Sequence, residues 1–116
     1  MILSHVRAGD LTLVVSPAHQ VEISAIADAT ERVHLLTLLQ QSGVKPAFDL
    51  PRVRQRAEAL TAQGCGPADA ARLAFAEAAG ADFVTCDDRL LRQCRRVGSS
   101  AWCGTPLAFC DKEELV

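Results

Sequence analysis

Acidic side chains stand at two junctions between predicted elements in the second half of the chain. Asp69 lies in the first turn of an alanine-rich helix that begins at Pro67, and Asp87 and Asp88 directly follow an apolar strand predicted at 82–86. In an α/β layer the helix before a strand runs antiparallel to that strand. We therefore expect the helix start and the strand end to meet at the carboxyl edge of the sheet, where open α/β sheets place their sites. Clustered carboxylates at this edge suit a hard divalent cation such as Mg²⁺.

The elements that must position these acids alternate between helix and strand. Prolines suit the first position of several of the helices, and glycines suit the turns that end them. Strands are predicted at 11–15, 82–86 and 101–103, and helices at 17–28, from Thr30 to 41, from Pro51 to the glycines at 64 and 66, at 67–80, and from Asp87 or Asp88 to about 96. This order predicts an α/β fold with a short parallel sheet flanked by helices.

Composition and length narrow the class of protein. The 116 residues are 49% hydrophobic, which is typical of one globular domain, and residues 1–116 are predicted to form it. The five cysteines are odd in number and include no CxxC pair, and we expect them to be reduced in a cytoplasmic protein. No apolar run approaches the ~20 residues that span a bilayer. The formal charge of −2 means that any nucleic-acid binding must depend on local patches.

Three arginines follow the paired aspartates at helical spacing. Arg89, Arg92 and Arg96 stand at positions i, i+3 and i+7 of the predicted helix, so they share one face. One interpretation is a solvated face whose charges favour the helix C-terminus. The other is a track for RNA phosphates beside Asp87, with Arg89 and Arg92 as substrate-binding residues.

Each acid also has a purely structural interpretation. Asp69 in a first turn favours the helix dipole by ~0.3–1 kcal/mol. Asp87 or Asp88 can be a helix cap. Glu22, on the predicted helix at 17–28, would by itself be interpreted as a solvated side chain. The function of these acids therefore depends on whether they lie together.

Three stretches of the sequence resemble PIN domains. They are LTLVVSPAHQVEI from Leu11, PADAARLAFAEAAGADFVTCDDRLL from Pro67, and TPLAF from Thr105. The resemblance extends from about residue 11 to 109 and implies a three-layer domain with a parallel sheet between helices. Many PIN proteins are VapC-type toxins, which are small endoribonucleases that depend on Mg²⁺ or Mn²⁺ and pair with an antitoxin protein. The resemblance also suggests a homodimer.

The resemblance implies roles for particular residues. Glu22, Asp69 and Asp87 match three acidic positions of the family, which implies that they are catalytic metal ligands. Asp88 is a further candidate ligand, and the sequence leaves the choice between Asp87 and Asp88 open. Thr85, two residues before Asp87, matches a hydroxyl position near the site that would contact substrate.

One part of the family pattern is absent from this sequence. PIN domains begin with a central strand, often L-D-T, whose aspartate is the first metal ligand, and the stretch MILSHVRAGD predicts only a helix fragment or turn. We therefore expect a PIN-like fold that lacks its first strand, and a ribonuclease impaired by the loss of one ligand. The alternative is an inactive remnant that binds an antitoxin or a like subunit. A receiver-like α/β binding module has no support, because no Gly-rich phosphate loop is present.

Overall fold

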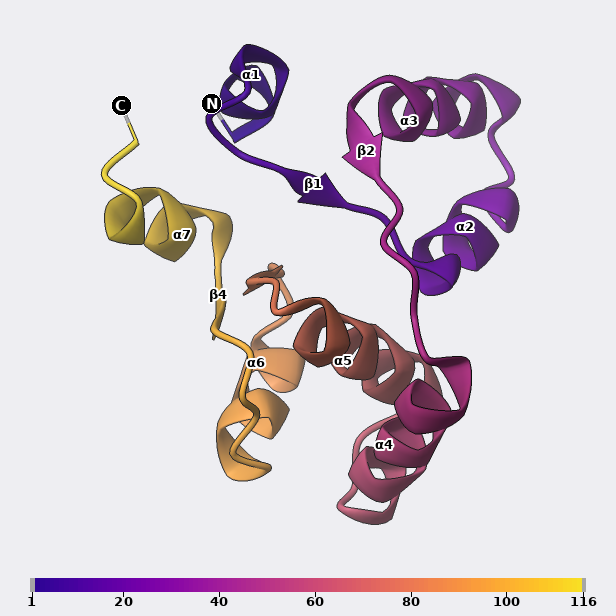
Figure 1. Ribbon diagram of the computed structural model, residues 1–116, viewed down its shortest axis with the longest axis vertical. Coiled ribbons are helices and arrows are strands. Elements are labelled where there is room, and N and C mark those ends of the chain that lie inside the picture. The colour runs from indigo at the N-terminus through magenta and orange to yellow at the C-terminus, as the bar shows by residue number, and fades with distance from the viewer. Residues whose placement is uncertain (1, 116) are drawn as a thin grey trace. The chain divides into compact units, whose positions relative to one another are not determined.

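The computed structural model describes residues 2–115, apart from the side chain of Leu3. The chain divides into two compact units between Ala47 and Phe48. Each unit contains one pair of short parallel strands together with helices (Figure 1). The predicted α/β class with short parallel sheets is therefore confirmed, whereas a single domain over residues 1–116 stays a prediction.

The first unit is mostly helical. Its elements are α1 (Ile2–Ala8), β1 (Leu13–Val14), α2 (Pro17–Ser24), α3 (Ala29–Ser42) and β2 (Gly43–Val44). Strand β1 pairs with β2, with Leu13 opposite Gly43, and the pair continues through the Val15 N–H, which donates to the Val44 carbonyl at 2.8 Å. Strand β2 lies in a stretch that the sequence predicts as a connection. Its start is crowded, because a Cβ on Gly43 would lie 2.4 Å from the Leu39 carbonyl oxygen.

Helix ends in the first unit differ in detail from the sequence predictions. Helix α3 begins at Ala29, one residue before the predicted start at Thr30, because Asp28 is its N-cap and accepts from the Glu31 N–H at 3.0 Å. Aspartate caps as well as threonine or better, so the earlier acid starts the helix. Helix α2 ends at Ser24, four residues before the predicted end. Neither α2 nor α3 contains a buried residue, and among the side chains that the structure describes in this unit the buried apolar one is Val15.

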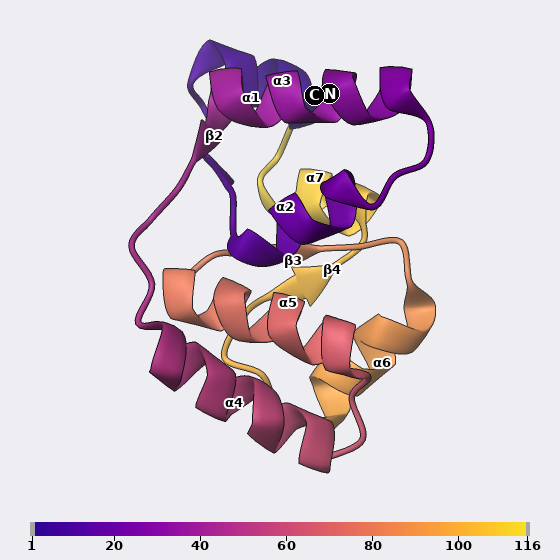
Figure 2. The same cartoon turned by 90° about the vertical axis from the view of Figure 1, so that its right-hand side faces the viewer.

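The second unit contains the rest of the described chain. Its elements are α4 (Leu50–Ala62), α5 (Pro67–Ala79), β3 (Phe83–Val84), α6 (Asp88–Arg96), β4 (Cys103–Gly104) and α7 (Pro106–Lys112). Helices α4 and α5 lie side by side in both views (Figures 1 and 2). Strand β3 pairs with β4, with Phe83 opposite Cys103. Each predicted strand and helix of this half is present, with shorter strands, and α7 is an additional helix.

The core of the second unit forms where α4, α5 and α6 meet. Buried side chains from the three helices and the turn after α4 make one cluster: Val53, Leu60, Cys65, Ala70, Leu73, Ala74, Leu90 and Cys94. The spacing of seven residues between Val53 and Leu60 places both on the face of α4 that the sequence predicts as apolar. Burial raises the pKa of the Cys94 thiol to about 12, so this cysteine acts as a small apolar side chain. All five cysteines are free thiols, and Cys86 is the exposed one.

Helix α7 is held by an aromatic and ionic cluster. Trp102, just before β4, packs against Phe109 of α7 with ring centroids 6.0 Å apart. Lys112 lies 5.1 Å from the Trp102 ring and 3.0 Å from the Asp82 carboxylate before β3. A Cβ on Gly104 would lie 2.4 Å from the Trp102 ring, so only glycine fits beneath it. These contacts join α7 to both strands of its unit. No helix among residues 2–115 has both the length and the apolar character that crossing a bilayer requires.

A partly buried ion pair joins α4, α5 and the segment before β4. Arg56 of α4 donates to both carboxylate oxygens of Glu77 in α5, at 2.7 and 3.3 Å, and the Ser99 hydroxyl donates to Glu77 at 2.6 Å. The Glu77 side chain is 11% exposed. Burial alone would raise the pKa of Glu77, but the hydrogen bonds from Arg56 and Ser99 and the charge of Arg56 outweigh it and hold the pKa below its usual value.

Glu77→Gln is expected to lower the free energy of unfolding by ~1–3 kcal/mol at pH 7, because charge-assisted hydrogen bonds are lost. A carboxylate whose pKa is lowered by folding contributes stability that is present above its unfolded pKa and is lost as the pH falls through its folded pKa. The difference between wild type and variant should therefore shrink in the acidic range below the ordinary glutamate pKa of about 4.3. Urea unfolding at pH 7 and at acidic pH measures both effects.

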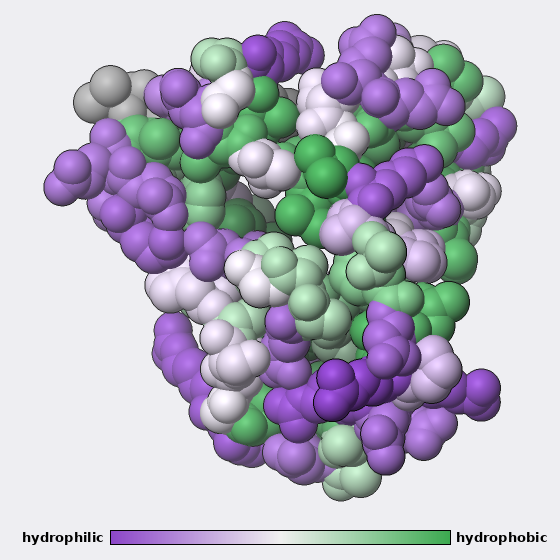
Figure 3. Space-filling model, in the orientation of Figure 1, coloured by the Kyte–Doolittle hydropathy of each residue, from purple (hydrophilic) through white to green (hydrophobic). Residues whose placement is uncertain are grey.

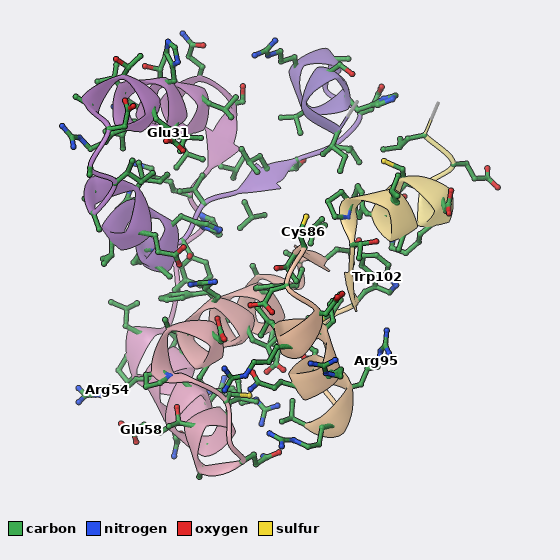
Figure 4. The ribbon with its side chains drawn as sticks, turned by 180° about the vertical axis from the view of Figure 1, so that it is seen from behind. Glu31, Arg54, Glu58, Cys86, Arg95 and Trp102 are labelled. Atoms are coloured by element: carbon green, nitrogen blue, oxygen red, sulfur yellow. The ribbon has the colours of Figure 1, made fainter. Side chains whose placement is uncertain are left out.

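Glu58→Gln is the matched control for this prediction. Glu58 lies on α4 and pairs with Arg54 at 3.3 Å, but the two side chains are 69% and 84% exposed (Figure 4). An exposed pair at this spacing contributes only ~0.3–0.5 kcal/mol. Equal destabilisation by the two substitutions would contradict a special role for the Glu77 ion pair.

Candidate functional site

Asp87 is fixed at the point where β3 leads into α6. It is the N-cap of α6, and its Oδ1 atom accepts from the Arg89 N–H at 3.0 Å and from the Leu90 N–H at 3.2 Å. This is the geometry of a capping aspartate, which satisfies two of the helix N–H groups left without intrahelical partners. Of the two adjacent aspartates, Asp87 is therefore the cap, and the exposed Asp88 lies in the first turn of α6.

Thr85 orients the backbone of Asp87. The Thr85 Oγ1 accepts from the Asp87 N–H at 3.1 Å, while the Thr85 N–H extends the sheet by donating to the Gly104 carbonyl at 3.0 Å. One residue therefore ties the turn before α6 to the end of β4. The turn can be located in Figure 4 by the labelled Cys86, which lies between Thr85 and Asp87. The structure thus brings the ends of β3 and β4 together at one edge, with Asp87 at that edge.

Thr105 is a second hydroxyl at this edge that the sequence reasoning did not assign to the site. It follows β4 directly, caps α7, and accepts from the Ala108 N–H at 3.1 Å. Because Thr85 pairs with Gly104, the neighbour of Thr105, the two threonines follow adjacent strand ends. The Thr-Pro sequence at a strand end was the available signal, since threonine before proline is typical of a helix N-cap.

Asp69 lies in the first turn of α5, as the sequence predicts. Its side chain is 25% exposed and its carboxylate lies 3.4 Å from the guanidinium of Arg72, one turn further along the same helix. The position favours the helix dipole, and the pair adds a local interaction. Asp69 is thus a partly buried carboxylate with a cationic neighbour.

Glu22 belongs to the first unit. It lies on α2, the helix that follows β1, and its side chain is exposed. Ser16, the N-cap of α2, donates its N–H to His19 Nδ1 at 3.1 Å. In the same unit, His5 lies 3.0 Å from the Asp10 carboxylate. Two of the three histidines thus take part in local contacts of the first unit.

A divalent metal ion at this edge would need carboxylate ligands close together. Within residues 2–115, no three His, Cys, Asp or Glu side chains are grouped so that they could hold a metal. Mg²⁺ usually binds through one or two carboxylates, with water and substrate phosphates completing its shell. Both cap bonds of Asp87 end on Oδ1, which leaves Oδ2 outside the cap. Carboxylate oxygens are the donors that Mg²⁺ and Mn²⁺ prefer, so the chemistry of Asp69 and Asp87 fits such an ion.

The three arginines predicted to share one face of α6 differ in their contacts. Arg89 and Arg92 are exposed on α6, consistent with a charged outer face. Arg96 instead reaches the end of α4, where its Nη2 donates to the Gln63 carbonyl at 2.8 Å. Helical spacing alone cannot reveal this difference, because Gln63 is 33 residues away in sequence.

Comparisons with known proteins agree with this arrangement. Residues 3–96 match the family model described as PIN domain. The match extends from α1 through α6 and includes Glu22, Asp69 and Asp87. Searches of curated proteins and of solved structures found no match. Since the match covers well over half of the 116 residues, the resemblance noted in the sequence is confirmed, and the chain belongs to the PIN domain family.

Proposed function

We propose that this protein is a metal-dependent endoribonuclease of the VapC toxin type, with reduced activity in the 116-residue chain. The observation that carries the proposal is the PIN family match over residues 3–96. PIN domains are in general nucleases that depend on divalent metal ions and bind nucleic acid. The toxin type, RNA as substrate, Mg²⁺ or Mn²⁺ as cofactor and a cytoplasmic location are the finer parts of the proposal.

The proposed chemistry is hydrolysis of a phosphodiester bond. A bound Mg²⁺ or Mn²⁺ would supply an activated water and neutralise charge on the leaving oxygen. In this scheme Asp87 would help to hold the cation through the part of its carboxylate that the helix N–H groups do not bind. Asp69 and Glu22 are the further proposed ligands, with Asp88 as an additional carboxylate. Thr85 holds the turn that presents Asp87, and Arg89 and Arg92 contact substrate phosphates.

The reduced activity in this proposal depends on the helix found at residues 2–8, where the family pattern has a strand. Residues 2–8 form helix α1, whereas the family pattern places a strand ending in an aspartate ligand before the segment of β1. Fewer carboxylates hold a cation more weakly, and a site with two metal ions is harder to build. The proposal therefore includes a weakly held metal and slow cleavage.

A second candidate function is a catalytically inactive PIN module that binds an antitoxin or a like subunit. The observation in its favour is that α2 and α3 of the first unit contain no buried residue and expose Val21 and Val33. Exposed apolar residues on neighbouring helices are typical of an interaction surface. Binding to an antitoxin, or assembly as a homodimer, would cover them.

RNA cleavage assays distinguish the two functions. The 116-residue chain should cleave RNA very slowly or not at all with Mg²⁺ or Mn²⁺. A version extended at its N-terminus by an apolar strand ending in aspartate should cleave readily and lose the activity with EDTA. If the extended chain shows no metal-dependent cleavage, the binding module is favoured. If the 116-residue chain is fully active, the additional aspartate is dispensable.

A further inference from the structure

Helix α6 carries four arginines in nine residues, and one of them has a structural role. Arg96 donates from Nη2 to the Gln63 carbonyl at 2.8 Å, at the C-terminal end of α4. A Cβ on Gly64 would lie 2.8 Å from the same nitrogen, so the guanidinium packs directly on this glycine. A cation at a helix C-terminus stabilises the unpaired carbonyls there. Arg96 therefore holds the end of α4 and is already engaged.

The other three arginines present their charge to solvent. Arg89, Arg92 and Arg95 are exposed, and their side chains form no hydrogen bond or ion pair with any residue in the described part of the chain. They follow one another at intervals of three, so they form a continuous ridge that spans ~9 Å of helix axis at 1.5 Å per residue. Figure 4 shows Arg95, and Figure 3 shows largely hydrophilic surface over the part of the second unit formed by α4 and α6.

The chemistry of this ridge favours a polyanion over a protein partner. Protein interfaces contain an apolar centre, but none of the large exposed hydrophobic residues lies on α6, whose leucines are buried. Arginine forks match phosphate oxygens in a bidentate geometry, and a guanidinium that has no ion pair loses none on binding. The chain as a whole has a formal charge of −2, so binding to a polyanion would depend on local positive charge such as the arginines of α6.

We propose that Arg89, Arg92 and Arg95, and not Arg96, form a surface on α6 that binds the phosphodiester backbone of single-stranded RNA. The inference rests on the proposed ribonuclease function and identifies how that substrate is held. The surface begins two residues after Asp87, so RNA bound along it extends from the candidate site. Contacts to phosphates carry no base information, so the surface binds different sequences alike.

Salt dependence of binding tests the assignment residue by residue. The measurement is fluorescence anisotropy of two short single-stranded RNAs of unrelated sequence, with Ca²⁺ in place of Mg²⁺ to suppress cleavage. Each phosphate contact contributes ~0.7 to the slope of log K against log salt for single strands. Arg89→Ala, Arg92→Ala and Arg95→Ala should each flatten the slope by about 0.7, and the triple variant by about 2.1, for both RNAs.

Two control variants remove one positive charge elsewhere. Arg54→Ala removes a charge that pairs with Glu58 on α4, and Arg96→Ala removes the contact with Gln63. Neither should change the slope, while Arg96→Ala should lower the urea midpoint. Unfolding followed by Trp102 fluorescence, the signal of the single tryptophan, confirms that each variant is folded.

The outcomes separate this inference from the proposed function. A slope that changes with Arg96→Ala and not with Arg95→Ala would overturn the assignment, and so would a slope that none of the three substitutions changes. Flattened slopes, together with no metal-dependent cleavage by the N-terminally extended chain, would support the arginine surface and contradict the nuclease function. Metal-dependent cleavage with unchanged slopes would support the nuclease function and contradict the arginine surface.

Discussion

Asp87→Asn in the N-terminally extended chain is expected to reduce metal-dependent RNA cleavage at least ~100-fold, because loss of outer-shell partners alone costs 10–100-fold at metal sites. The substitution removes the carboxylate charge that would hold the cation. It keeps the shape of the side chain and a carbonyl oxygen that can accept from the Arg89 and Leu90 N–H groups. Asparagine caps helices about as well as aspartate, so the stability of α6 should hardly change. Initial cleavage rates at several Mn²⁺ concentrations give the measurement.

Two neighbouring substitutions make this result interpretable. Asp88→Asn removes the same charge one residue further on, where no helix N–H fixes the carboxylate, and it should reduce cleavage far less. Asp87→Ala removes charge and cap together, so it should also lower the free energy of unfolding by ~1 kcal/mol. If Asp88→Asn were the more damaging change, Asp88 would be the ligand and Asp87 only the cap. If neither changed the rate, the carboxyl edge would not be the active site.

Leu73→Ala is expected to have the largest effect on stability, with a loss of ~2–5 kcal/mol in the free energy of unfolding. Leu73 is 0% exposed at the centre of the cluster formed by α4, α5 and α6. The loss combines the transfer free energy of the removed methyl groups with the cost of the cavity left behind. Trp102 belongs to the same unit, so its fluorescence during urea unfolding reports on this core.

Leu107→Ala is the matched control within the same unit. Leu107 lies on α7 and is 80% exposed, so its truncation should change stability by less than about 0.5 kcal/mol. Similar urea midpoints for the Leu73 and Leu107 variants would show that the cluster around Leu73 does not determine the stability of the second unit.

The sequence predicted the second unit better than the first, for a physical reason. Helices α4 and α5 have apolar residues on one face, a proline at the first or second position and glycines after the end, so local signals and burial agree. In the first unit, α2 and α3 bury no residue, so burial does not reinforce the local signals for where these helices begin and end. Strand β2 has only two residues and depends on pairing with β1, which no local signal reveals.

Residue types and spacing alone determined the family resemblance, the candidate acids, the helix that starts at Pro67 and a cap at Asp87 or Asp88. The tertiary structure decided which aspartate is the cap, that Thr85 binds the Asp87 N–H, and that Arg96 contacts the end of α4. These contacts depend on exact backbone positions, and the one from Arg96 to Gln63 joins residues distant in sequence. Helical periodicity defines a face of α6, but only packing against α4 separates the engaged arginine from the three that face solvent.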